Sequence, residues 1–88
     1  MNLTNEQKED LRHAVLEALA VRHPAALSVP QLARAVKKVT PYLFEESDVT
    51  AALEILKGML FADFTLDELG STKYWRATSN GVIHFERA

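Results

Sequence analysis

The chain has 88 residues, of which 10 are Lys or Arg and 12 are Asp or Glu, and its formal net charge is −2. This length suits a single domain over residues 1–88, and the absence of cysteine excludes disulfides, a thiol nucleophile and thiolate metal ligands. The charge balance excludes a strongly basic nucleic-acid coat. No apolar run approaches the roughly 20 residues of a membrane span, and the first residues lack a secretory pattern. We therefore expect a cytoplasmic protein without a membrane partner.

The first predicted helix follows Thr4. Together with Gln7 this residue forms a capping-box pattern, in which each side chain satisfies a free amide of the other residue. Apolar residues then recur at steps of three and four, which predicts a buried stripe of Leu11, Val15 and Leu19. The pair His23-Pro24 ends the helix, because the residue before proline avoids helical geometry.

The second predicted helix opens with another capping pattern, Ser28 followed by Gln31, with Pro30 in the first turn. Thr40-Pro41 ends it. Its predicted buried stripe consists of Leu32, Ala35, Val36 and Val39. The basic side chains Arg34, Lys37 and Lys38 then point outward.

The third predicted helix begins at Ser47 and continues to about Ala62. Phe44 lies just upstream, where it can pack against the first turn as a hydrophobic staple. The predicted buried stripe consists of Val49, Ala52, Leu53, Leu56 and Leu60.

The pattern then changes from helical spacing to that of a hairpin. A first strand around residues 64–66 leads into a turn containing Gly70, and a second strand over residues 73–77 is rich in strand-forming residues. Neighbouring residues of a strand point to opposite faces, so we expect one of Tyr74 and Trp75 to be buried and the other exposed.

The end of the chain allows two interpretations. Thr78 can cap a short terminal helix, whereas Asn80-Gly81 is a hairpin signal that would lead into a third strand. The sequence supports both equally.

Three helices followed by a short hairpin is the element order of the winged helix-turn-helix superfamily. Residues 28–36, SVPQLARAV, resemble the first helix of that motif, and residues 49–56, VTAALEIL, resemble the second. Residues 74–81, YWRATSNG, resemble the phrase that closes the wing in many members. The resemblance implies a small α+β winged-helix domain. Such domains most often bind DNA through the third helix and the wing, while others serve only as protein-interaction modules.

Charge is distributed unevenly over these elements. Residues 25–44 carry three basic and no acidic groups, residues 45–69 carry one basic and seven acidic groups, and residues 70–88 carry three basic groups and one acidic group. Basic groups of the second helix and the wing can meet phosphates, and polar groups of the third helix can meet the groove. The predicted DNA-binding residues are Arg34, Lys37, Lys38, Ser47, Thr50, Lys57, Lys73 and Arg76.

The acidic third helix supports a different hypothesis, because carboxylates close to phosphates repel them. In this interpretation the domain is an interaction or assembly module that forms a homodimer or captures a basic protein partner. The link from Thr40 to Glu46 is also longer than in a tight helix-turn-helix and carries three large apolar residues. The residues predicted for such an interface are Tyr42, Leu43, Phe44, Asp48 and Glu54.

Catalytic and ligand-binding patterns are weak. His13 and Glu17 have the spacing of a metal-binding pair on a helix, but no third ligand is apparent, and a solvated pair is the simpler interpretation. The glycines Gly58, Gly70 and Gly81 are scattered and form no phosphate-binding loop. We therefore expect no enzyme activity, no cofactor, no metal and no small-molecule substrate.

Overall fold

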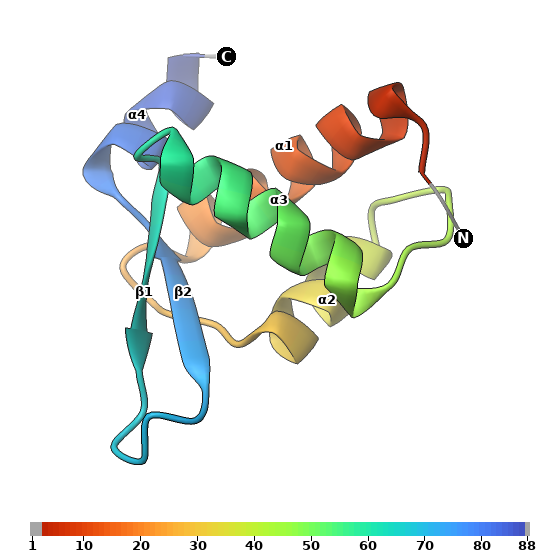
Figure 1. Cartoon of the computed structure of the whole chain (residues 1–88). Coiled ribbons are helices and arrows are strands. Elements are labelled where there is room, and N and C mark those ends of the chain that lie inside the picture. The colour runs from red at the N-terminus through yellow and green to blue at the C-terminus, as the bar shows by residue number, and fades with distance from the viewer. Residues whose placement is uncertain (1–2, 88) are drawn as a thin grey trace.

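The computed structural model describes residues 3–87 of the chain. Its elements are α1 (Asn5–Arg22), α2 (Val29–Lys37), α3 (Glu46–Gly58), β1 (Ala62–Leu66), β2 (Lys73–Ala77) and α4 (Ser79–Arg87). The first three helices pack together, the β1-β2 hairpin extends from one side of them, and α4 lies at the end opposite the hairpin tip (Figure 1). The predicted order of helices followed by a hairpin is confirmed, with a fourth helix added after it. Among the described residues no helix combines the length and apolar character needed to cross a membrane.

The first two helices begin where the sequence predicts. The backbone amide of Thr4 donates to Oε1 of Gln7 at 3.0 Å, and the Gln7 amide donates to Oγ1 of Thr4 at 3.1 Å. At the start of α2, the Ser28 amide donates to Oε1 of Gln31 at 2.9 Å. Each contact satisfies a donor that has no partner within the helix, and so fixes where the helix starts.

The second helix is shorter than its predicted stripe. It ends at Lys37, and the amides of Val39 and Thr40 both donate to the carbonyl oxygen of Val36, at 3.0 and 3.1 Å. Val39 lies beyond the C-cap residue Lys38, and its side chain is 64% exposed. The prediction that Val39 is buried is wrong, whereas Leu32 and Val36 are fully buried.

The third helix begins one residue before the predicted Ser47 and ends at Gly58 instead of near Ala62. Its cap is Glu45, whose amide donates to Oδ2 of Asp48 at 2.8 Å. At the other end Leu60 adopts a φ of 66°, the left-handed conformation in which helices commonly stop. The Phe61 amide then donates to the Leu56 carbonyl at 2.9 Å, which closes the last turn. Leu60 consequently points into solvent, and its predicted place in the buried stripe is wrong.

The hairpin pairs β1 with β2 in antiparallel register, with Phe64 opposite Trp75. The predicted turn is confirmed: Gly70 has a φ of 70°, a conformation that glycine adopts without a steric penalty. In the same turn the Ser71 amide donates to Asp67 at 2.9 Å and so lowers the pKa of that carboxyl. Leu27 adds a short bridge on the far side of β2, through two hydrogen bonds of 2.7 Å with Trp75.

The terminal segment forms α4, so the structure selects the helical alternative over the third strand. Oγ1 of Thr78 accepts from the Gly81 amide at 3.0 Å and donates to the Leu60 carbonyl at 2.6 Å. Gly81 lies directly against the backbone of Phe61, where no side chain fits. The phrase YWRATSNG therefore comprises residues 74–77 of β2, a helix cap and the first turn of α4.

The core gathers one stripe from each of the first three helices and closes on the hairpin. Trp75, at 1% exposure, is the largest of its fully buried side chains, while Tyr74 on the opposite face is half-buried. The other fully buried large side chains are Leu11, Leu19, Leu32, Leu53, Val15, Val36 and Val49. The hairpin is thus fixed to the helices through β2.

Candidate nucleic-acid interface

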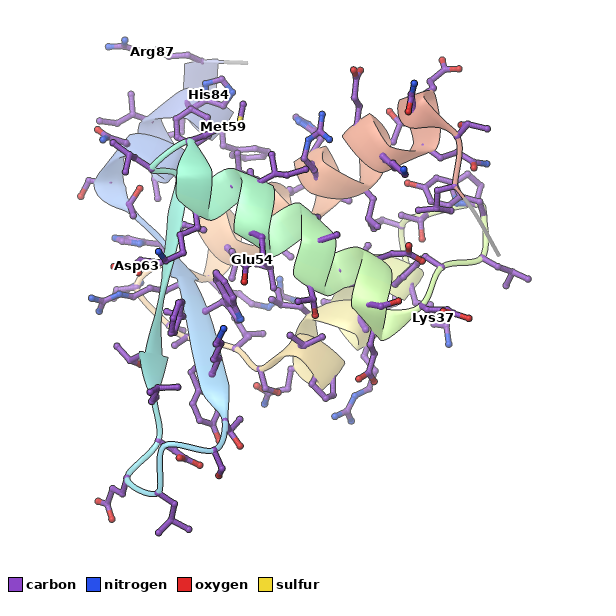
Figure 2. The ribbon with its side chains drawn as sticks, viewed as in Figure 1. Lys37, Glu54, Met59, Asp63, His84 and Arg87 are labelled. Atoms are coloured by element: carbon purple, nitrogen blue, oxygen red, sulfur yellow. The ribbon has the colours of Figure 1, made fainter. Side chains whose placement is uncertain are left out.

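The outward face of α3 is the centre of the candidate interface. Ser47, Thr50 and Glu54 are exposed along it, because the helix buries the opposite stripe. The Thr50 hydroxyl donates to the Glu46 carbonyl at 3.1 Å and so remains able to accept a hydrogen bond. Glu54 lies near the middle of the helix and Lys37 at the end of the neighbouring α2 (Figure 2).

Charged and aromatic side chains meet where α3 contacts the hairpin. Nζ of Lys73 lies 4.5 Å from the ring centre of Phe64 and 5.9 Å from that of Trp75, and it is 3.9 Å from Oε1 of Glu54. Nζ of Lys57 lies 5.6 Å from the Phe64 ring. We call this cluster of Glu54, Lys57, Phe64, Lys73 and Trp75 the helix–wing joint.

Strand alternation explains how the joint is assembled. Phe64 and Trp75 are register partners and Lys73 lies two residues before Trp75, so the three side chains share one face of the hairpin. Glu54 and Lys57, three residues apart, are neighbours on the surface of α3. The joint therefore unites two predicted DNA-binding residues, Lys57 and Lys73, that lie far apart in the sequence.

Arg76 lies on the other face of the hairpin from Lys73. It is the register partner of Asp63 and lines a shallow hollow with His23 and Thr78. Lys73 and Arg76, both predicted to contact DNA from the wing, therefore lie on opposite faces of the hairpin.

A second cluster of basic side chains lies at the other end of the interface. Arg34 and Lys37 line a hollow between α2 and the start of α3, together with Phe44 and Glu46. Lys38 is exposed at the C-terminal cap of α2. The exposed face of α3 is therefore flanked by basic side chains from α2 at one end and from the helix–wing joint at the other.

The residues predicted for a protein interface are mostly engaged within the fold. The Tyr42 hydroxyl donates to the Gln7 carbonyl at 2.9 Å, and burial together with the nearby Asp10 raises the pKa of Tyr42. Phe44 is half-buried against the core, whereas Leu43 is 68% exposed. The carboxylate of Asp48 accepts from the Glu45 amide, and Glu54 belongs to the joint.

The histidines take part in contacts within the fold. The ring of His13 lies 6.0 Å from that of Phe85, the ring of His84 stacks on Phe61 at 4.3 Å, and Nδ1 of His23 is 3.1 Å from the Ala77 carbonyl oxygen. Within residues 3–87 no three His, Asp or Glu side chains gather as a metal site would require.

Two features of the interface were not predicted from the sequence. The ammonium groups of both lysines in the joint lie over the ring of Phe64. Glu54 on α3 forms an ion pair with Lys73 on β2. The alternation of the hairpin could have identified Phe64 as a neighbour of Lys73. The approach of Glu54 depends on how α3 packs against the hairpin, which no local pattern reports.

No family model and no curated protein matches the chain, but solved structures share its fold. The chain superposes on a PadR-like transcriptional regulator of Bacillus cereus with a TM-score of 0.72 and 18% identity, covering 96% of this chain and 82% of that one. It superposes on the transcriptional regulator PcaV of Streptomyces coelicolor with a TM-score of 0.70 and 22% identity, covering 97% and 52%.

ZitR of Lactococcus lactis gives a TM-score of 0.71 at 18% identity, covering 93% of this chain and 56% of that one. The chain thus spans about half the length of ZitR and PcaV. These similarities show that the chain shares the fold of these regulators, and its element order is the one that the winged helix-turn-helix resemblance predicts.

Proposed function

We propose that the protein is a DNA-binding transcription regulator that acts by binding, without catalysis. The observation that carries this proposal is the exposed face of α3 between two basic groups, Arg34, Lys37 and Lys38 on one side and Lys57 and Lys73 on the other. Helix α3 would enter the major groove, while the flanking cations neutralise phosphates. The fold shared with transcriptional regulators and the expected cytoplasmic location are consistent with this function.

Two of the carboxylates that argue against DNA binding already have partners. Asp48 caps α3 through the Glu45 amide and lines the hollow between α1 and α3, to the side of the proposed groove-facing stripe. Glu54 is balanced by Lys73 at 3.9 Å. The local repulsion of phosphates is therefore weaker than the acidic count of residues 45–69 indicates.

Charge reversal on α2 tests the proposal. We expect Lys37→Glu and Lys38→Glu each to weaken binding to a random-sequence duplex, and the double variant to weaken it roughly tenfold at low salt. The loss should be similar for different DNA sequences, because phosphate contacts carry no direct sequence information. Fluorescence anisotropy with a labelled duplex at several salt concentrations measures both quantities.

Arg87→Glu is the matched control, since it makes the same charge change at the far end of the molecule from Lys37 (Figure 2). Its effect should be much smaller than that of Lys37→Glu. Equal losses for the two variants would show that total charge governs binding, with no role for this face. Undetectable binding of the unmodified protein at low salt would contradict the proposed function.

A further inference from the structure

The wing lysine of the proposed interface already has a protein partner. The side chains of Lys73 and Glu54 remain 47% and 55% exposed, so their pair is open to solvent and to an approaching ligand. The ammonium group lies over Phe64 and close to Trp75, which holds it on the side of the hairpin that faces α3. Lys73 is thus directed toward Glu54 before any DNA is bound.

A phosphate that recruits Lys73 must compete with Glu54. Glu54 lies 3.9 Å from the Lys73 ammonium group as an ion-pair partner, and an incoming phosphate is an alternative anion for the same charge. An exposed ion pair of this kind is weak, which makes the exchange easy in both directions. The pair therefore lowers the affinity of the wing for phosphate without blocking it.

Lys57 provides a place for the displaced carboxylate. It lies three residues after Glu54 on the same helix, a spacing at which side chains are neighbours, and it already borders the joint at 5.6 Å from the Phe64 ring. When Lys73 turns to a phosphate, Glu54 can pair with Lys57, so that Lys73 is then the lysine of the joint that neutralises phosphate. The charge of the carboxylate is then balanced in both states.

We propose that Glu54 gates the wing of this domain: it holds Lys73 against α3 in the free protein, and a DNA phosphate takes Lys73 by displacing Glu54. This inference rests on the proposed function and adds a control of affinity to it. A gate differs from simple repulsion between Glu54 and DNA. With a gate, the effect of Glu54 on DNA affinity depends on the presence of Lys73, whereas with repulsion it does not.

A double-mutant cycle separates the two mechanisms. The four proteins are the unmodified chain, Glu54→Gln, Lys73→Gln and the double variant, each measured by anisotropy on a random-sequence duplex over a range of salt. With a gate, Glu54→Gln tightens binding, and Lys73→Gln costs about two- to fivefold more affinity in the Glu54→Gln background than in the unmodified one. The salt dependence also steepens in Glu54→Gln by up to about 0.9 in the log–log slope, and this increase disappears in the double variant.

Glu68→Gln is the control for charge alone, because it removes an exposed carboxylate from the hairpin turn. Its effect should be the same whether Lys73 is present or replaced. In the free protein, Glu54→Gln should shift the nuclear magnetic resonance signals of the Lys73 side chain, whereas Glu68→Gln should leave them unchanged.

Each remaining outcome counts against the gate. If Lys73→Gln costs the same affinity in both backgrounds, Glu54 acts by repulsion and the gate is overturned, while the proposed function stands. Unchanged Lys73 signals in the free Glu54→Gln variant would also overturn it, independently of DNA. If all four proteins fail to bind duplex at low salt, the proposed function fails and the gate fails with it.

Discussion

Replacing Trp75 by alanine is expected to lower the free energy of unfolding by about 3–5 kcal/mol, the range observed for large buried aromatic side chains. Trp75 is 1% exposed and stands where the helices, the hairpin and the Leu27 bridge meet. Its ring centre lies 5.0 Å from that of Phe64 on β1. Removal of the ring would leave a cavity at the point that fixes the hairpin to the helices. This loss is a large fraction of the total stability of a small domain, which is only about 5–15 kcal/mol.

Urea unfolding followed by far-ultraviolet circular dichroism is the suitable measurement, because Trp75 is the single tryptophan and its fluorescence is lost with it. Trp75→Phe should retain most of the stability: among the described residues the buried indole nitrogen has no hydrogen-bond partner to lose. Leu43→Ala, at a side chain 68% exposed, serves as a surface control with an expected change within about 0.5 kcal/mol. A Trp75→Ala variant as stable as this control would contradict the assignment of Trp75 to the centre of the core.

Replacing Gly81 by alanine is expected to destabilise the protein by about 1–3 kcal/mol, as overpacking of a tight contact does. A Cβ atom at this position would overlap the carbonyl oxygen of Phe61 and lie 2.9 Å from its carbonyl carbon. Backbone cannot move aside as a flexible side chain can, so α4 would have to shift away from the end of α3. The contacts that Thr78 makes with Leu60 and Gly81 would be disturbed as well.

Gly58→Ala is a matched control for this variant. Gly58 also lies in a helix, but nothing comes within 4 Å of a Cβ added there. Alanine should therefore stabilise α3 by up to about 0.5–1 kcal/mol, because it restricts the unfolded chain more than glycine does. Relative to the unmodified protein, the midpoint of thermal unfolding should fall for Gly81→Ala and rise for Gly58→Ala. If Gly81→Ala were neutral, α4 would not be seated against Phe61 as the structure places it.

Helix starts were predictable because their causes are local. The capping pairs of α1 and α2 lie three residues apart in the sequence, and the same pairs form the observed hydrogen bonds. The hairpin turn is similarly local, since Gly70 supplies the positive φ that it requires. These features need no knowledge of the rest of the fold.

Helix ends were less predictable. Leu60 continues the apolar periodicity of α3, but it adopts a left-handed conformation that usually selects glycine. Tertiary contacts maintain it there, because its carbonyl accepts from the Thr78 hydroxyl at 2.6 Å. The same distant contact decided between the two interpretations of the terminal segment, which the Asn80-Gly81 pair left open.

The candidate interface was predictable in residue type and only partly in arrangement. Basic groups on α2 and on β2 follow from their helical and strand positions. Strand parity alone could have separated Lys73 from Arg76, since residues three apart lie on opposite faces. The pairing of Lys73 with Glu54 depends on the packing of α3 against the hairpin and could not be predicted from either segment alone. This pair balances the charge of one of the carboxylates that make the third helix acidic.

The most direct test of the proposed DNA-binding face is a titration of the isotope-labelled protein with a short random-sequence duplex, followed by amide nuclear magnetic resonance shifts at low salt. We predict that the shifts concentrate at residues 34–38, 46–57 and 64–73, and that they diminish as salt is added. The absence of shifts, or shifts confined to α4 and the adjoining residues of α1, would contradict the proposed DNA-binding face.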